Sequence, residues 1–223
     1  MMKKYWAFYV PYLVFVLAFL LLVLCNSKAD LHLWMTSFNS PAADIFFHYY
    51  TYVGDWVPFA VVGGLLFFRY RIALLVLAAQ LVSAVFSTSL KHIFNESRPS
   101  LYFSQHFPSV SFHHVAGEHL YTTHSFPSGH TITAFAFFMM LAFYTRHNPV
   151  RFLYFVLAFL VGYSRVYLSQ HFAVDVLAGS AIGVLVSVFC YQYIDNKLLA
   201  WADSSIYKDF KKKSKDKSLL SEI

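Results

Sequence analysis

Charged residues and cysteine are scarce in this sequence. Asp, Glu, Lys and Arg make up 13% of the 223 residues, about half of the share of roughly 25% that soluble domains carry. Hydrophobic residues make up 58%, so a fold in water would leave many of them exposed. The scarcity of charge also excludes intrinsic disorder, which needs a polar, charge-rich chain. Two cysteines cannot build a disulfide framework. We therefore expect one compact domain whose solvent is largely lipid.

Apolar segments of about the length that a bilayer requires run through the chain. A membrane-spanning α-helix takes about 20 mostly apolar residues, and each segment is too apolar on all sides for an amphipathic surface helix. The sequence therefore predicts an all-α, polytopic membrane protein with six transmembrane helices packed as a bundle. The predicted helices cover residues 6–25, 57–68, 72–90, 131–144, 152–167 and 172–194.

Lys and Arg are divided unevenly between the two sides of the membrane that six spans define. With the N-terminus inside, 13 of the 17 Lys and Arg residues face inward. Cytoplasmic segments of membrane proteins are enriched in these residues, so we expect both termini in the cytoplasm. Residues 1–195 would form the transmembrane domain, and residues 196–223 a basic cytoplasmic tail near anionic lipid. The outer side keeps only four of the basic residues, which are Lys28, Lys91, Arg98 and Arg165.

The outer ends of the last four predicted helices collect ionisable groups, which are functional suspects in a membrane protein. Lys91, Arg98 and Arg165 would bring three positive charges together there. Such a cluster is costly near lipid unless an anion neutralises it. The guanidinium group of Arg can donate two parallel hydrogen bonds to phosphate oxygens, and Lys adds a point charge. Ser128 and Gly129 stand where a helix begins, and the free N–H groups of a helix N-terminus bind anions. The sequence thus predicts a site for a tetrahedral oxyanion.

Two histidines and a carboxylate could supply the chemistry at this site. His171 and Asp175 are four residues apart, so they share one face of a helix. Asp175 can hold one imidazole nitrogen and leave the other free to attack, which makes His171 the candidate nucleophile and phosphohistidine the candidate intermediate. His130 is the candidate acid for the leaving group. Together with the cations, these residues predict phosphotransfer without a metal or another cofactor.

Three motifs around these residues resemble those of the type 2 phosphatidic acid phosphatase (PAP2) superfamily, in its integral-membrane lipid phosphatase branch. The chain has a K-x6-R-P motif that begins at Lys91, a P-S-G-H motif at residues 127–130, and an S-R-x5-H-x3-D motif that begins at Ser164. They lie within residues 91–175, in the family's order and with every defining residue. The resemblance covers about residues 50–195 and implies a PAP2-like helical bundle.

The resemblance also implies roles that agree with the chemistry of the side chains. It implies that His171 is the nucleophile, that Asp175 orients it, and that His130 is the general acid. It implies that members of the family work without a metal. The residues that would bind the phosphate are Lys91, Arg98, Ser128, Gly129 and Arg165.

We therefore expect a phosphatase that acts on a lipid phosphate or diphosphate at the periplasmic face of a bacterial inner membrane. Undecaprenyl diphosphate and lipid A phosphate are favoured, because both are outer-leaflet lipids in bacteria, over phosphatidylglycerol phosphate and phosphatidic acid. A phosphotransferase with the same phosphohistidine, and a lipid transporter or binding protein without turnover, are the alternatives. The expected partners are the lipid substrate and membrane lipids, and not nucleic acid. The sequence does not indicate an oligomeric state.

The predicted outer loop, residues 100–126, is rich in histidine. One hypothesis is a metal site, since His and carboxylate side chains are common metal ligands. The loop has no H-x3-H pair with a supporting carboxylate, so we favour an outer loop that contacts lipid headgroups or simply titrates. The histidines in and beside it are His92, His106, His113, His114, His119 and His124.

Overall fold

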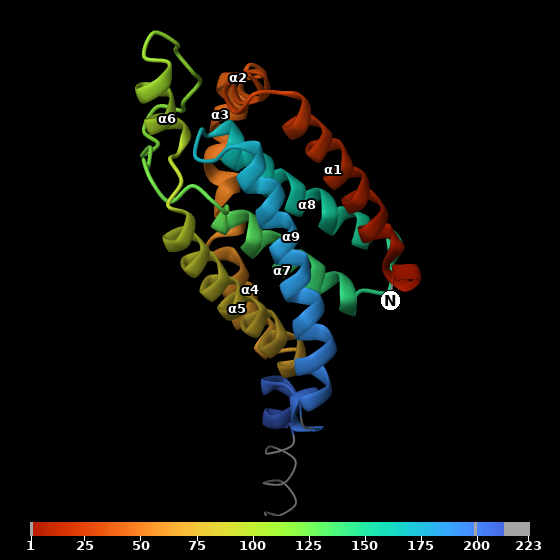
Figure 1. The fold of residues 1–223 in the computed structure, drawn as a ribbon. Coiled ribbons are helices and arrows are strands. Elements are labelled where there is room, and N and C mark those ends of the chain that lie inside the picture. Colours follow the sequence, from red (N-terminus) through yellow and green to blue (C-terminus); the bar gives the residue numbers. More distant parts are fainter. Residues whose placement is uncertain (1, 199, 212–223) are drawn as a thin grey trace, which may run out of the picture.

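The computed structural model describes residues 2–198 and 200–211, and in this part of the chain the backbone forms helices and loops without a β-strand. The predicted all-α fold is confirmed. Figure 1 shows the helices as an elongated bundle. The α-helices are α1 (Trp6–Cys25), α2 (Lys28–Thr36), α3 (Pro41–Tyr50), α4 (Val57–Leu66), α5 (Tyr70–Phe94), α6 (Pro99–His106), α7 (Gly129–Tyr144), α8 (Asn148–Tyr167) and α9 (Ala173–Phe189).

A helix occurs in each of the six regions where the sequence predicts a membrane span. Four helical stretches are long and apolar enough to cross a bilayer, namely Lys3–Cys25, Tyr70–His106, Asn148–Tyr167 and Ala173–Lys197. The two others, α4 and α7, are apolar but shorter, with 10 and 16 residues. The count of six spans therefore stays a prediction. The last predicted span ends as a π-helical turn, Cys190–Ile194, that continues α9.

Helix α7 forms the centre of the bundle. It packs against α5, α8 and α9, and eleven of its 16 residues are buried. A helix that is apolar on all sides is stable in this position, because every face meets another apolar face. The first turn of α7 thereby has a fixed place among the ends of the neighbouring helices.

Helix α9 approaches α7 closely through glycine. A Cβ atom on Gly183 would lie 2.5 Å from the carbonyl oxygen of Ile132 and 2.9 Å from Cβ of Phe135. Small residues let membrane helices pack with their backbones near each other. At this point of the interface even a methyl group has no room.

We expect Gly183→Ala to lower the stability of the protein, since the new methyl group must push α7 and α9 apart. Overpacking of this kind costs about 1–3 kcal/mol. The measurement is the thermal unfolding midpoint of the purified protein in detergent. Gly64→Ala is the matched control, because a Cβ atom there meets no atom within 4 Å, and we expect no loss for it. Equal midpoints for the two variants would show that the interface tolerates the added methyl group.

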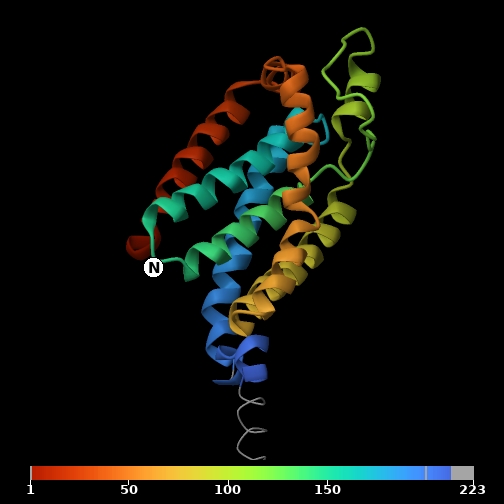
Figure 2. The same ribbon diagram turned by 180° about the vertical axis from the view of Figure 1, so that it is seen from behind.

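Different helices lie at the two ends of the bundle. Helices α2, α3 and α6 lie together at one end, at the top of Figure 1, with the loop that precedes α7. The start of α1 lies toward the other end, beside the end of α9, and the hydroxyl groups of Tyr5 and Tyr191 are 3.0 Å apart. Figure 2 shows the same arrangement from behind. Which end faces the cytoplasm stays a prediction.

The first part of the predicted tail packs against the start of α5. Arg71 forms ion pairs with Asp195 at 2.8 Å and with Asp203 at 2.7 Å, and the N–H group of Tyr70 donates to the carbonyl of Ser204. Packing thus continues past residue 195, the last residue of the predicted transmembrane domain. The tail's most basic part, with Lys212, Lys213, Lys215 and Lys217, lies outside the described residues.

Candidate active site

The structure brings the residues of the three motifs together at the end of the bundle that carries α2, α3 and α6. The three cations all act electrostatically on the imidazoles of both His130 and His171, so the groups form one cluster. Lys91 and Arg165 lie in the last turns of α5 and α8, and Arg98 directly precedes α6. Ser128 directly precedes α7, which begins with Gly129 and His130. His171 follows α8, and Asp175 lies in the first turn of α9.

A tight turn between α8 and α9 places His171. The N–H groups of Gln170 and His171 both donate to the carbonyl of Arg165, at 3.0 and 3.1 Å. Ser169 makes the reversal possible with a left-handed backbone, φ +51°, which few residues other than glycine adopt. The turn, called the catalytic turn below (residues 168–172), therefore returns His171 to the end of α8 beside Arg165.

His171 and Asp175 face each other as the sequence predicts, but they are not in close contact. Nδ1 of His171 lies 3.5 Å from Oδ2 of Asp175 and forms no hydrogen bond within the described chain. Oδ2 instead accepts from the hydroxyl of Ser125 and from the N–H of Phe172. Catalytic hydrogen bonds are often long before a substrate binds. The carboxylate thus faces Nδ1 and leaves Nε2 of His171 unobstructed by Asp175.

Burial and nearby positive charge favour the neutral form of the His171 imidazole. Its exposed fraction is 1%, and burial together with the charges of Arg98, Arg165 and Lys91 holds the pKa of His171 well below its usual value. Desolvation and nearby positive charge both disfavour the protonated form. Only the neutral form of an imidazole has a lone pair with which to attack phosphorus.

Arg165 is a buried cation with few partners. Its exposed fraction is 6%. Nη1 donates to the hydroxyl of Thr51 at 2.6 Å, but the buried Nε has no hydrogen-bond partner among the described residues. Asp55 and Glu118 act on Arg165 only electrostatically. A buried charge without a counter-ion is costly, so this side chain is suited to receive an anion.

Arg98, in contrast, is held by carbonyl oxygens. Nε donates to Thr123 at 2.9 Å, and Nη1 donates to the backbone and side-chain oxygens of Gln170 at 3.1 and 3.2 Å. Nη2 makes one long contact, 3.5 Å, with the carbonyl of His124. Of the guanidinium group, therefore, chiefly the Nη2 edge remains for an external ligand.

The start of α7 offers donors beside Lys91. A Cβ atom on Gly129 would lie 3.5 Å from Nζ of Lys91, so the absent side chain lets the ammonium group approach the helix N-terminus. The N–H group of Ser128 is not available to a ligand, because it donates to the carbonyl of Asp175. Its buried hydroxyl accepts from Thr131 at 2.8 Å and keeps its own proton to donate.

The charges at this site do not balance. Three cations surround His130 and His171, and the carboxylate in the cluster is that of Asp175. Neither imidazole contributes a negative charge. Excess positive charge in a buried cluster is stable when a multiply charged anion enters it. Among the described residues, no three His, Cys, Asp or Glu side chains come together as metal ligands.

Three further residues support the site, and the sequence analysis missed all of them. The uncharged hydroxyl of Thr51 accepts a hydrogen bond from Arg165. Gln170 binds Arg98, and Ser125 donates to Asp175. Gln170 lies within the third motif, directly before His171, and Ser125 lies two residues before the second motif. This proximity is the one signal that could have drawn attention to them. Thr51, in the turn after α3, has no such signal.

Comparison with protein families gives a match over the region that carries these residues. The sequence model of the PAP2 superfamily matches residues 69–199. The bacitracin transport permease protein BcrC of Bacillus licheniformis is 40% identical over 67 residues, which are 30% of this chain and 32% of that protein. Phosphatidylglycerophosphatase B of Bacillus subtilis (strain 168) is 39% identical over 83 residues, 33% of this chain and 40% of that protein. The chain thus spans less than half the length of the curated relatives that it matches.

Two solved structures have a similar fold. LpxE of Aquifex aeolicus superposes with a TM-score of 0.65 and 28% identity, over 74% of this chain and 94% of that chain. A transmembrane PAP2-type phosphatidylglycerolphosphate phosphatase from Bacillus subtilis superposes with a TM-score of 0.62 and 24% identity, over 90% and 100%. The second likeness concerns the fold alone. Because the family model covers more than half of the chain, this multi-pass membrane protein belongs to the PAP2 superfamily.

Proposed function

We propose that the protein is a lipid phosphatase that works through a phosphohistidine at His171. The observation that carries the proposal is the pairing of a buried, neutral imidazole with a buried guanidinium that lacks a counter-ion, at His171 and Arg165. Their backbones are joined by the hydrogen bond from the N–H of His171 to the carbonyl of Arg165. A phosphoryl group that lies between them would neutralise the cation and meet the nucleophile at once.

The reaction would proceed in two displacements at phosphorus. In the first, Nε2 of His171 attacks, the P–O bond to the lipid breaks, and His130 gives its proton to the departing oxygen. In the second, the neutral His130 takes a proton from water, the water oxygen attacks, and the P–N bond breaks to release orthophosphate. Lys91, Arg98 and Arg165 would stabilise the charge that develops on the phosphoryl oxygens, and no step requires a metal.

The substrate that we propose is a lipid of the outer leaflet, with undecaprenyl diphosphate and lipid A phosphate ahead of phosphatidylglycerol phosphate and phosphatidic acid. The site lies at the end of the bundle opposite to the inner, basic segments of the predicted topology. In a bacterial inner membrane that end would be periplasmic. The name of one similar protein, phosphatidylglycerophosphatase B, supports a membrane lipid phosphate as the substrate class.

Purified protein offered a panel of prenyl diphosphates, lipid A and glycerophospholipids should release free orthophosphate from at least one of them. We expect the same rate with and without a metal chelator, and inhibition by vanadate, which imitates the five-coordinate phosphoryl group of the transition state. Free phosphate is the deciding readout. Labelled phosphate that appears only on another lipid would identify a phosphotransferase instead. Vanadate binding without turnover of any lipid would favour a binding protein, and activity lost with chelator and restored by a divalent cation would contradict the mechanism.

A further inference from the structure

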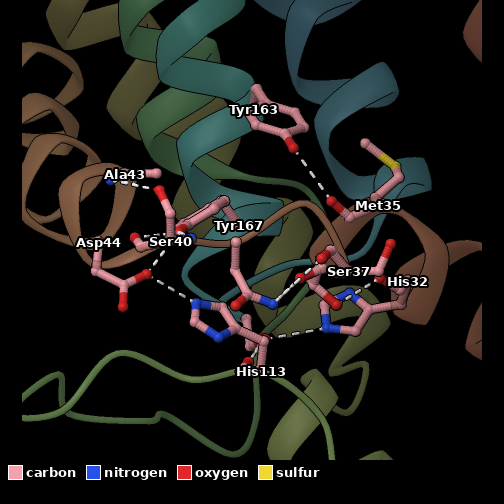
Figure 3. A network of polar contacts seen from close by, with 12 residues as sticks. His32, Met35, Ser37, Ser40, Ala43, Asp44, His113, Tyr163 and Tyr167 are labelled. Carbon is pink, nitrogen blue, oxygen red and sulfur yellow. Dashed lines mark hydrogen bonds and ion pairs between the residues drawn. The ribbon is translucent and has the colours of Figure 1, made fainter.

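The outer loop between α6 and α7 (residues 107–128, called the outer loop below) is fastened to α3 by two imidazole–carboxylate contacts. Nε2 of His113 donates to Oδ1 of Asp44 at 3.0 Å, as Figure 3 shows. Nδ1 of His48 donates to Oε1 of Glu118 at 3.1 Å. The hydroxyl of Tyr167, at the end of α8, also donates to Asp44. Asp44 therefore joins the outer loop, α3 and α8 at one point.

From His113 the contacts continue into the catalytic turn. The hydroxyl of Ser169 donates to the carbonyl of His113. Its oxygen lies 3.1 Å from Nε2 of His32, a fully buried histidine. Because the Ser169 hydroxyl gives its proton to His113, His32 is the donor in that contact. Ser169 adopts its left-handed backbone in this bonded position, two residues before His171.

The catalytic turn and the outer loop together supply the acceptors that orient Arg98. Gln170 accepts from Arg98 through two oxygens, while its own amide donates to the carbonyl of His119 at 2.8 Å. The other acceptors are the carbonyls of Thr123 and His124 in the outer loop. The guanidinium of Arg98 is thus fixed by the outer loop and the catalytic turn together, and no side chain of α6, the helix that Arg98 precedes, takes part in any of these bonds.

We propose that the outer loop is a positioning device for the phosphate site, and that His113 is the positioning residue that fastens it. Through Asp44 on one side and Ser169 on the other, His113 holds the loop and the catalytic turn in the register that aims the Nη2 edge of Arg98 at the phosphate. The proposal rests on the proposed function in that it takes the ligand of Arg98 to be a phosphoryl group. It gives His113 of the outer loop, and His48 of α3 opposite it, a role that involves neither a metal nor proton transfer, since each of the two meets a single carboxylate.

The adjacent His114 makes a matched control possible. Its side chain is exposed, and its ring lies 6.3 Å from that of Phe112 between centroids. His113→Ala removes the contact with Asp44, and His114→Ala removes the same side chain one residue away. His113→Gln keeps an N–H donor that can reach Asp44 without a charge or a ring. The three variants separate the hydrogen bond from the mere presence of histidine in the loop.

The measurement is the dissociation constant of vanadate for the purified protein, together with kcat and KM for a hydrolysed lipid and the thermal midpoint. We expect His113→Ala to weaken vanadate binding and raise KM about tenfold, the effect of a misplaced charge-assisted hydrogen bond. His114→Ala should match the wild type, and His113→Gln should recover most of the loss. Unchanged vanadate affinity in His113→Ala, with or without a lower midpoint, would overturn the proposal, and so would an equal loss in His114→Ala. Vanadate binding needs no turnover. A wild type that binds vanadate but hydrolyses no lipid would therefore refute the proposed function, while the vanadate affinities of the variants would still test the positioning role of His113.

Discussion

His171→Ala is expected to reduce phosphate release from the lipid substrate by at least about 1,000-fold, the order of loss that follows removal of a catalytic nucleophile. The imidazole is buried and neutral, and alanine offers no lone pair that could take its place. The variant should also fail to acquire label from a phosphate-labelled lipid in an acid-sensitive bond, which is the signature of phosphohistidine. Rate assays and rapid-quench labelling measure both effects.

The matched control is His147→Ala, at the far end of α8 from the site, where the side chain is exposed. We expect wild-type turnover for this variant. His171→Ala should still fold and insert, because Nδ1 of His171 forms no hydrogen bond with the described chain, and its thermal midpoint measures what the loss of a buried ring costs. Turnover near the wild-type rate in His171→Ala would exclude the phosphohistidine mechanism, even if the protein proves to be a phosphatase.

Arg165→Met is expected to lower kcat/KM by about 100- to 1,000-fold, the cost of removing one preorganised donor of charge stabilisation, or about 3–4 kcal/mol. Methionine fills a similar volume but cannot bind a phosphoryl oxygen. The more telling expectation concerns stability. The wild-type Nε has no partner in the described chain, so removal of the buried charge should leave the thermal midpoint of the empty protein unchanged or raise it. The stabilisation that vanadate gives to the wild type should disappear.

Arg151→Met provides the opposite pattern as a control. Arg151 is as buried as Arg165 and lies on the same helix, each with an exposed fraction of 6%. Its guanidinium donates to the carbonyls of Lys4 and Thr145 and to the side chain of Asn148. Its loss should lower the thermal midpoint and leave vanadate binding intact. If both arginine variants lost stability alike and kept vanadate binding, Arg165 would be a structural residue.

The transmembrane part of the fold could be predicted from the sequence because every helix in lipid needs a long apolar run. A long apolar run such as residues 6–25 becomes helix α1 with the same bounds, since its backbone must satisfy its own hydrogen bonds in the bilayer. Helices α2, α3 and α6 were not predicted. They have only 8 to 10 residues, too few to span a bilayer, and they depend on the rest of the protein for their stability.

The candidate site also contains residues that the sequence could predict and residues that it could not. Residues such as His171 and Arg98 could be proposed because their types and spacing carry chemistry along the chain. The residues that fix them could not. Ser125 meets Asp175 across 50 positions, and His113 meets Asp44 across 69. Such pairs arise from the packing of the helices, which no periodicity in one sequence encodes. Asp44 showed no role until the fold placed it between α3, α8 and the outer loop.

The contact between the first helix and the last ones has a consequence for biosynthesis. Helix α1 leaves the ribosome before α8 and α9, yet these two helices are among its neighbours in the finished protein, and Tyr5 meets a tyrosine 186 positions later. Helices insert into the membrane before they associate with one another. The buried face of α1 must therefore be covered by lipid alone while the intervening helices are made. The bundle can close only after α8 and α9 have been made, and a ribosome that stops before α8 leaves α1 inserted without these two partners.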